Sequence, residues 1–271
     1  MSTHQGKKKV TVPEIMAMKE RREKIAALTA YDYLTAEMLD EVGMDIILVG
    51  DSAGMVIAGN ETTLPITMDE MIFITQNVRR GVRNALLVAD MPFLSYQTSV
   101  SDGIKNAGRF LKEAQTEAVK VEGGKAVVEL VEKLVGYGIP VMGHLGLTPQ
   151  SINKFGTYKL QGSDPQTANV LKSDAKLLEQ AGAFSIVLEK VPASLAKEIS
   201  GSLKIPTIGI GAGPDCDGQV LVSHDMLGIF DKFQPKFVRR YAEIGKTMRN
   251  AFAEYVKDIK NGEFPNLDES F

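Results

Sequence analysis

Six charged or ionisable side chains stand out because each lies within or just after a short apolar run of the sequence. They are Asp51, Asp90, Lys120, Glu122, His144 and Glu189. Such apolar runs are typical of buried strands, and buried charge is costly unless it is paired or bound to a cation. Any one of these acids could simply cap the helix that follows it, which aspartate does well. Six such side chains on five apolar runs instead indicate one functional site.

Three of these acids have the chemistry that a hard divalent cation requires. Asp51, Asp90 and Glu122 offer carboxylate oxygens, and Mg²⁺ prefers octahedral oxygen coordination with positions left for water or substrate. Zinc is disfavoured because the sequence has only three histidines and neither an H-E-x-x-H nor a paired-cysteine pattern. The sequence therefore predicts a Mg²⁺ site with open positions, which suits a bidentate 2-oxo acid.

The remaining candidates each have a plain structural alternative. Lys120 and Glu122 lie two apart on one strand, so their side chains share a face. Lys120 can pair with a substrate carboxylate there, or the two can form an internal ion pair. Glu189 ends an apolar run, where loss of water contact would make it a competent base; alternatively it is a surface glutamate opening the next helix. His144 is the histidine expected at the site, since His4 lies in the N-terminal segment and His224 could as easily be a loop histidine with ordinary partners.

This set of residue types predicts enolate chemistry. A divalent cation bound to a ketone oxygen and a neighbouring carboxylate makes the α-proton of the ketone more acidic. A carboxylate base can then remove that proton and leave a carbon nucleophile. The residues alone leave open whether the reaction is an aldol-like transfer or a carbon–carbon cleavage. A non-catalytic barrel that binds an oxo acid is the alternative of another class.

The elements that must position these residues alternate along the chain. About eight apolar runs are each followed by a segment with helical spacing, and they begin near Ile25, Ile46, Leu86, Ala118, Pro140, Ser185, Pro206 and Val220. Continuous apolar runs indicate parallel strands buried on both faces. Eight such units in 271 residues favour an α/β fold, a single (β/α)8 TIM barrel, whose chemistry lies at the carboxyl ends of its strands.

An open doubly wound sheet is the alternative fold, and the glycine-rich segment 209–213 is the feature that could suggest it. That segment lacks the full dinucleotide fingerprint and comes late in the chain, so it is weak evidence for a nucleotide cofactor.

Helix signals complete the expected architecture. Thr11 with Glu14 has capping-box spacing and Pro13 suits a first turn, which predicts a short helix ahead of the first strand, at the bottom of the barrel. Thr67 with Glu70 has the same spacing before a helix, and residues 237–259 predict one or two final helices. No linker composition divides the chain, so we expect one catalytic domain over residues 1–271, with loose ends at 1–9 and 263–271.

The composition excludes several classes of protein. The formal net charge is -3 and the pI is near 5.8, so we expect neither nucleic acid nor a membrane surface as partner. No apolar run is long enough to span a membrane, and the N-terminus lacks the apolar stretch of a signal peptide. Cys216 is the only cysteine, which excludes an intrachain disulfide and suits a reducing cytoplasm.

Motifs throughout the chain, from about Val10 to Gly262, resemble those of the ketopantoate hydroxymethyltransferase family. The motifs that carry the resemblance are LTAYD (28–32), LVGDSAGM (48–55), TLP (63–65), ADMPF (89–93), VKVEGG (119–124), GHLGLTPQS (143–151), LE (188–189), IGIGAG (208–213) and DGQVLV (217–222). So many motifs in the same order make a chance similarity very improbable. The family is similar in turn to the phosphoenolpyruvate mutase and isocitrate lyase barrels.

The resemblance implies a specific reaction and specific roles. A hydroxymethyl group passes from 5,10-methylenetetrahydrofolate to 3-methyl-2-oxobutanoate and gives 2-dehydropantoate, on the way to pantothenate and coenzyme A. It implies that Asp51, Asp90 and Glu122 bind Mg²⁺ and that Glu189 accepts the proton. It also implies a homo-oligomer, expected to be a decamer. The substrate-binding set expected from it is Asp51, Ser52, Asp90, Lys120 and His144.

The chain departs from the family in one loop. Thr157 and Ser163 stand where the family often has glycine and arginine. This difference leaves the folate-binding residues open. A carbon–carbon lyase of the isocitrate lyase type stays the rival enzyme. Lyases of that type generally carry a catalytic cysteine on a loop, and no such loop is visible around Cys216.

Overall fold

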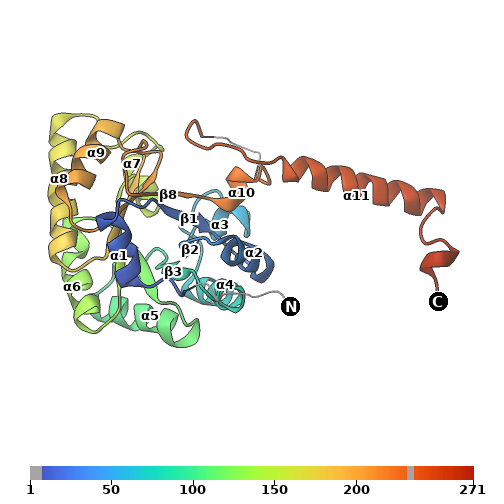
Figure 1. The fold of residues 1–271 in the computed structure, drawn as a ribbon, viewed down its shortest axis with the longest axis horizontal. Coiled ribbons are helices and arrows are strands. Elements are labelled where there is room, and N and C mark those ends of the chain that lie inside the picture. Colours follow the sequence, from blue (N-terminus) through green and yellow to red (C-terminus); the bar gives the residue numbers. More distant parts are fainter. Residues whose placement is uncertain (1–7, 231–234) are drawn as a thin grey trace. The chain divides into compact units, whose positions relative to one another are not determined.

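A computed structural model describes residues 8–230 and 235–271 of the chain. Its centre is a closed barrel in which eight parallel strands pair in sequential order, β1 with β2 through to β8 with β1 (Figure 1). This confirms the predicted (β/α)8 barrel over an open sheet. The strands are β1 (Ile25–Thr29), β2 (Ile46–Val49), β3 (Leu86–Asp90), β4 (Ala118–Glu122), β5 (Val141–Gly146), β6 (Ser185–Glu189), β7 (Thr207–Ile210) and β8 (Gly218–Leu221).

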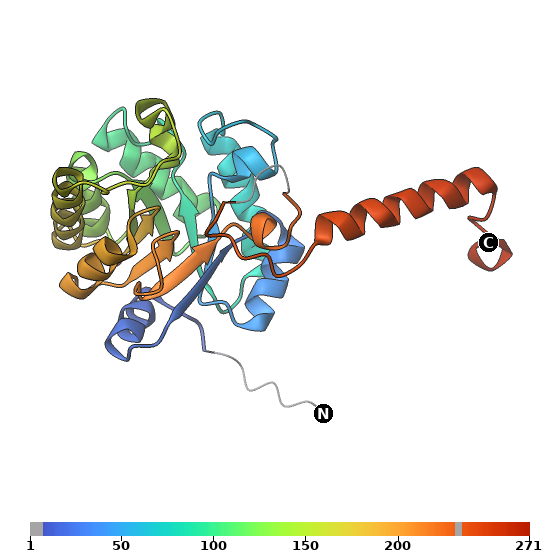
Figure 2. The same ribbon diagram turned by 90° about the horizontal axis from the view of Figure 1, so that it is seen from above.

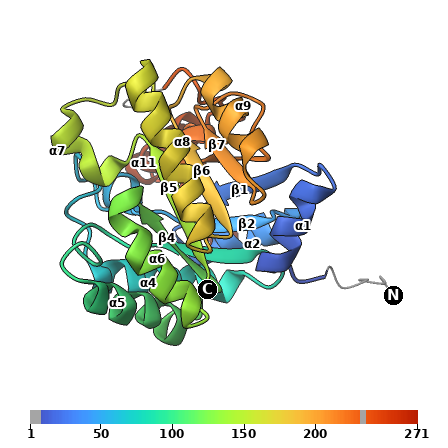
Figure 3. The ribbon, with the colours of Figure 1, turned by 90° about the vertical axis from the view of Figure 1, so that its left-hand side faces the viewer.

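Helices follow the strands and lie outside them (Figure 2 and Figure 3). Thr67 and Glu70 form the predicted capping box at the start of α4. Ahead of the strands or between them are α1 (Val12–Glu20), α2 (Tyr33–Val42), α3 (Ala53–Val56), α4 (Met68–Gly81), α5 (Val100–Glu113), α6 (Val128–Gly136), α7 (Ile152–Phe155), α8 (Pro165–Gln180) and α9 (Ala193–Ser202), with short 3-10 turns η1 (Lys125–Val127) and η2 (Pro149–Ser151).

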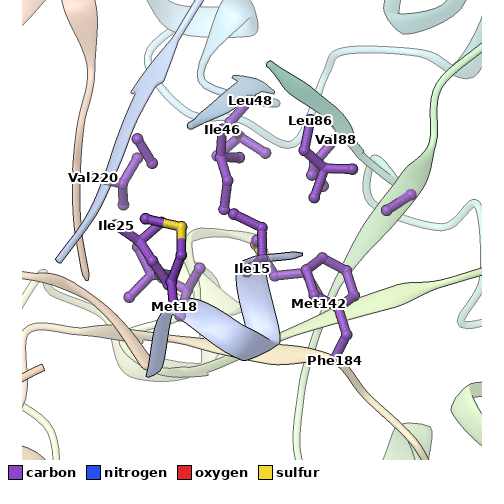
Figure 4. Close-up of a cluster of buried hydrophobic side chains, with 14 residues drawn as sticks. Ile15, Met18, Ile25, Ile46, Leu48, Leu86, Val88, Met142, Phe184 and Val220 are labelled. Carbon is purple, nitrogen blue, oxygen red and sulfur yellow. The ribbon is translucent and has the colours of Figure 1, made fainter. Parts of the chain in front are cut away.

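Helix α1 closes the amino-terminal end of the barrel, as its place in the sequence predicts. Its side chains Ile15 and Met18 are buried against residues near the starts of the strands, among them Ile25, Ile46 and Met142 (Figure 4). Thr11 caps α1 by accepting a hydrogen bond from the Glu14 backbone N–H. The Glu14 side chain pairs with Arg21 instead of completing the predicted capping box. A packed lower end leaves the opposite rim of the barrel for chemistry.

The chain divides into two compact units, one ending at Leu221 and the other beginning at Val222. The second unit contains α10 (Ser223–Met226), α11 (Ile244–Asn261) and η3 (Leu267–Glu269). The last α-helix, α11, begins at Ile244, later than the predicted start at residue 237. The single domain over 1–271 stays a prediction.

The two ends that were expected to be loose are partly described. Residues 1–7 lie outside the described residues. Lys9 Nζ donates a 2.8 Å hydrogen bond to the Ala85 carbonyl oxygen, just before β3. At the other end, Asn266 and Glu269 form a capping box around η3. Within residues 8–230 and 235–271, no helix has both the length and the apolar character needed to cross a membrane.

Candidate active site

The strand register brings the predicted site residues to one rim of the barrel, formed by the carboxyl ends of β2 to β6. Asp90 at the end of β3 is the register partner of Lys120 in β4. Glu122 at the end of β4 is the partner of His144 in β5. Side chains of register partners on adjacent strands lie next to each other. Two of the contacts described below are therefore set directly by strand pairing.

Asp90 and Lys120 form a buried ion pair, with 2.8 Å between Oδ1 and Nζ and side chains at most 5% exposed. Burial raises the pKa of Asp90, although the Lys120 ammonium opposes this effect. Burial lowers the pKa of Lys120, but the charges of Asp90, Glu122 and Asp51 outweigh it and raise that pKa. Lys120 is therefore held as a cation, and its ion-pair partner is Asp90 rather than Glu122, the internal partner that the sequence left open as an alternative.

His144 stands between three charged groups. Its Nδ1 is 3.1 Å from Lys120 Nζ and 3.4 Å from Glu122 Oε1, and its Nε2 is 3.3 Å from Glu189 Oε2. Burial and Lys120 lower the pKa of His144, but the carboxylates of Glu122 and Glu189 outweigh them and raise it to about 9. His144 thus links the acids at the ends of β4 and β6, and its role in binding substrate stays a prediction.

Asp51 is the acid of this rim whose charge is least compensated. It follows β2 and is buried, and its backbone N–H donates to Asp90 Oδ2 at 3.1 Å. Burial and the negative charges of Asp90 and Glu122 raise the pKa of Asp51 well above its ordinary value, against weaker opposition from Lys120. Within residues 8–230 and 235–271, Asp51 forms no direct ion pair, and Lys120 acts on it only from a greater distance than on Asp90.

Glu122 has the opposite electrostatic balance. Burial alone would raise its pKa, but His144 and Lys120 outweigh burial and lower it. Glu122 therefore carries its negative charge deep within the rim. Its buried Oε1 atom faces His144 Nδ1 at 3.4 Å but has no hydrogen bond of good geometry, which is uncommon for a buried carboxylate oxygen.

These acids fit a divalent cation by the chemistry of their donor atoms. Hard carboxylate oxygens suit Mg²⁺, the negative charges around Asp51 outweigh the effect of Lys120, and Glu122 Oε1 has no hydrogen bond of good geometry. Within the described ranges, however, no three His, Cys, Asp or Glu side chains form a group that could hold an ion together. Mg²⁺ usually keeps several waters and takes one or two carboxylates. Such sparse coordination matches this arrangement.

Two further predicted site residues are Ser52, which follows Asp51 after β2, and Glu189, which ends β6. Ser52 Oγ is 2.7 Å from the hydroxyl oxygen of Tyr31, which comes from the segment after β1. Gly50 leaves room for Ser52, because a Cβ at position 50 would come within 2.6 Å of its Oγ.

Glu189 ends β6, and its side chain is 16% exposed, more than that of His144. Gly146 at the end of β5 has φ +92°, which favours glycine. It also lets the β5 backbone approach the Glu189 backbone closely, because a Cβ at position 146 would lie 2.2 Å from the Glu189 carbonyl oxygen. Burial and the charge of Glu189 raise the pKa of Tyr158. Glu189 is thus the predicted acid with the most open surroundings.

Three further residues belong to this network and were not among the predicted site residues. They are Tyr31, Tyr96 and Gln150. Tyr31 and Gln150 lie within motifs that carry the family resemblance, directly beyond strands, and this position was the available signal. Tyr96 lies in the connection between β3 and α5, and only the fold brings it to Glu122.

Comparison with known proteins gives a consistent picture. Residues 9–267 match the family model described as ketopantoate hydroxymethyltransferase. The 3-methyl-2-oxobutanoate hydroxymethyltransferase of Syntrophus aciditrophicus is 55% identical over 271 residues and covers 100% of both chains. The enzyme of that name from Moorella thermoacetica is 54% identical, over 97% of this chain and 98% of its own.

Solved structures support the fold at much lower sequence identity. A phosphonopyruvate hydrolase structure superposes with a TM-score of 0.63 at 10% identity, covering 97% of this chain and 91% of that one. A structure of 2,3-dimethylmalate lyase, from the phosphoenolpyruvate mutase and isocitrate lyase superfamily, gives 0.61 at 14% identity, with 97% and 89% covered. At such identities the likeness shows the barrel fold alone.

Proposed function

Because this chain belongs to the ketopantoate hydroxymethyltransferase family, we propose that it transfers a hydroxymethyl group from 5,10-methylenetetrahydrofolate to 3-methyl-2-oxobutanoate, giving 2-dehydropantoate. Relatives that match the whole chain carry the name of this activity. The observation within the chain that supports it best is the connected row of Asp51, Asp90, Lys120, His144 and Glu189 across one rim of the barrel.

Asp51, Asp90 and Glu122 would hold one Mg²⁺. Because the three acids do not form a ready-made group, at least one of them would reach the ion through water or after a side-chain shift. When bound, the cation would stabilise negative charge on the ketone oxygen of the oxo acid. It would also balance the negative charge that raises the pKa of Asp51.

The substrate-binding residues are Asp51, Ser52, Asp90, Lys120 and His144. Lys120, held as a cation by its acidic neighbours, would bind the substrate carboxylate. Ser52, fixed by Tyr31 at 2.7 Å, would donate a hydrogen bond to a substrate oxygen. Both are buried or partly buried polar groups, whose interactions with a substrate are strong because little water competes.

Glu189 would act as the base. It removes the proton from the carbon that bears the methyl groups, and that carbon would then form a bond to the methylene carbon of the folate. Both carbon–nitrogen bonds of this methylene group would break, water would supply the oxygen of the new hydroxyl group, and tetrahydrofolate would leave. His144 Nε2, 3.3 Å from Glu189 Oε2, orients the carboxylate. Glu189 has the access that a base needs, since its side chain is the most exposed of the row.

The rival lyase reaction has less support. Cys216, the sole cysteine, is fully buried, and burial raises the pKa of its thiol, which makes it a poor acid–base group for a catalytic loop. Incubation with the oxo acid, Mg²⁺ and methylenetetrahydrofolate separates the candidates. A transferase forms the hydroxymethylated product, a lyase forms fragments, and a non-catalytic binding barrel forms neither.

Replacement of Glu189 tests the base directly. We expect Glu189→Gln to keep affinity for the oxo acid but to lose deuterium exchange at the methyl-bearing carbon by about 10²–10⁴-fold, followed by proton NMR in D2O. The matched control is Glu198→Gln on α9, whose side chain is 60% exposed and whose exchange should equal that of the unmodified chain. Unchanged exchange in Glu189→Gln would remove Glu189 from this role.

A cytoplasmic location and a decameric assembly are part of the same proposal and are supported by the family relationship. The mass of the assembly in solution tests the second of these.

A further inference from the structure

The carboxamide of Gln150 is buried among the acids of the site, and all of its hydrogen-bonding positions are used. Gln150 lies in η2, just after β5, and is 6% exposed. Its Nε2 donates to Asp51 Oδ2 and to the Met91 carbonyl oxygen, both at 2.9 Å. Its Oε1 accepts from the Tyr96 hydroxyl at 2.8 Å and from Gln97 Nε2 at 3.0 Å. Two donors and two acceptor positions are all that an amide has.

These four contacts fix the orientation of the Gln150 amide. If the amide were flipped, its oxygen would face the Asp51 carboxylate and the Met91 carbonyl, and its N–H groups would face two donors. The buried oxygens of Asp51 and Met91 would then lose their donor, at about 1–3 kcal/mol for each lost bond, whereas Gln97 is exposed and can turn to water. The side chain therefore has one stable arrangement, with its N–H groups directed at Asp51.

The same residue also holds Glu122. The backbone N–H of Gln150 donates to Glu122 Oε2 at 3.0 Å. Gln150 thus binds one oxygen of an acid that follows β2 and one oxygen of an acid that ends β4. The second oxygen of Glu122, Oε1, is buried, faces His144 Nδ1 at 3.4 Å and has no hydrogen bond of good geometry, so the Gln150 contact does not occupy it.

Tyr96 supports this arrangement from the connection between β3 and α5. Its hydroxyl oxygen accepts a hydrogen bond from the Glu122 backbone N–H at 3.0 Å. The single hydroxyl proton is then donated to Gln150 Oε1 at 2.8 Å, which is shorter than the 3.2 Å to the Glu122 carbonyl oxygen. Tyr96 is itself buried. It therefore connects the position of Gln150 to the backbone that carries Glu122.

A neutral donor suits this place better than a charged one. Lys120 already neutralises Asp90 as a full positive charge. A second ammonium beside Asp51 would compete with a divalent cation for the carboxylate oxygens. A carboxamide instead orients the carboxylate through hydrogen bonds and leaves the negative charge for the cation.

From these contacts we propose that Gln150 is a positioning residue, which holds Asp51 and Glu122 so that their remaining oxygens face the cation. This inference rests on the proposed Mg²⁺ site. It assigns Gln150 no contact with the reacting atoms, because its amide is fully occupied by the protein. Its effect should appear in the affinity for Mg²⁺ rather than in the proton transfer itself.

Gln150→Met tests this role, because methionine keeps the length of the side chain and removes its donors. We expect the dissociation constant for Mg²⁺, measured by isothermal titration calorimetry on the full chain, to rise about tenfold or more. Deuterium exchange into the oxo acid should be low at limiting Mg²⁺ and return near the unmodified rate at saturating Mg²⁺. The matched control is Gln76→Met on α4, which loses a bond to the Glu113 carbonyl oxygen and should bind Mg²⁺ normally.

Two results would overturn the inference in different ways. If Gln150→Met folds and binds Mg²⁺ as tightly as the unmodified chain, Gln150 merely supports the loop after β5. If the unmodified chain itself binds no Mg²⁺, the proposed cation site is wrong, and the inference is lost with it. The unmodified chain and the Gln76→Met control distinguish these two failures in one set of titrations.

Tyr96→Phe keeps the test decisive if Gln150→Met does not fold. Phenylalanine retains the ring and removes the hydroxyl that anchors Gln150 Oε1. We expect a smaller loss of Mg²⁺ affinity, about threefold, and little further loss when the two substitutions are combined, because the Tyr96 hydroxyl joins the Gln150 amide and the Glu122 backbone into one unit. Normal Mg²⁺ affinity in Tyr96→Phe, or losses that simply add in the double variant, would contradict the proposal.

Discussion

Two lysine–carboxylate pairs in this chain have the same length but different surroundings. Lys120 and Asp90 lie 2.8 Å apart with side chains 5% and 4% exposed. Lys172 and Glu198 also lie 2.8 Å apart, with side chains 35% and 60% exposed. A buried pair that loses one partner leaves an uncompensated charge, whereas an exposed pair is replaced by water. These pairs therefore allow burial to be tested at constant distance.

We expect Lys120→Met to lower the free energy of unfolding by about 3–5 kcal/mol and Lys172→Met by less than about 1 kcal/mol. Urea denaturation in the presence of EDTA measures both, without a contribution from bound cation. The reason is that Asp90 would be left buried beside Asp51 without its ammonium. Equal losses in the two variants would mean that the Asp90 pair is weaker than its burial implies.

The sequence predicts which residues meet at the site but not how they pair. Asp51, Asp90, Glu122 and Glu189 could be placed at strand ends because apolar runs end there. The spacing left open an ion pair between Lys120 and Glu122, yet the register sets Asp90 beside Lys120. Strand register depends on how two distant segments align, and local spacing does not contain that information.

At the scale of elements, buried strands were the easiest to predict. The run beginning at Ile46 ends at Val49 as expected, since both faces of β2 are buried. The fifth apolar run covers only residues 140–142, whereas β5 extends to Gly146. The polar His144 lies inside this strand, so apolar character alone does not show where the strand ends. The final helix begins at Ile244 although helical spacing begins earlier. Spacing detects a face, whereas packing decides where an element begins.

Helix α2 illustrates the same limit from the side of burial. Val42 fits the apolar spacing of this helix but is 74% exposed, while Asp40 is 4% exposed. Asp40 accepts hydrogen bonds from the backbone N–H groups of Asn84 and Ala85 and from Asn84 Nδ2, at 2.7–2.8 Å. The Asp40 carboxylate, near the end of α2, thus holds the segment just before β3 in place. No local sequence pattern predicts this contact.

We expect Asp40→Asn to lower the free energy of unfolding by about 2–3 kcal/mol at pH 7, because an amide cannot accept all three bonds. Burial raises the pKa of Asp40, but the donors of Ala85 and Asn84 outweigh it and hold that pKa below its ordinary value of 3.8. The stability from Asp40 is therefore present above that value and is lost as the pH falls through the lower pKa of the folded state.

Thermal or urea denaturation of Asp40→Asn between pH 7 and pH 3 measures this dependence. The difference from the unmodified chain should be largest at neutral pH and should shrink below about pH 4. The matched control is Asp69→Asn, whose side chain is 84% exposed and whose change should stay within about 0.5 kcal/mol. A constant difference across this range would show that the Asp40 carboxylate does not carry the effect.

At the scale of the whole molecule, the barrel explains how one rim can serve catalysis while other surfaces serve assembly. Its lower end is filled by α1, and its polar residues gather at the opposite rim. On the outside, α2 carries a row of apolar side chains four residues apart, Leu34, Met38 and Val42, which are 63%, 58% and 74% exposed. A contiguous exposed apolar row on one helix face is typical of a protein interface.

If the chain forms the expected decamer, a second copy of the chain would cover the apolar row on α2. We expect ten chains of 29.5 kDa to sediment as one species in analytical ultracentrifugation. Met38→Glu should shift the mass to smaller assemblies, because a carboxylate in an apolar interface is costly unless it is paired.

Val170→Glu on α8 is the matched control. Val170 is similarly exposed, at 54%, but it is not part of this row, so the decamer should persist. A decamer unchanged in Met38→Glu would place the contacts between copies elsewhere on the barrel, and a monomer in the unmodified chain would contradict the assembly itself.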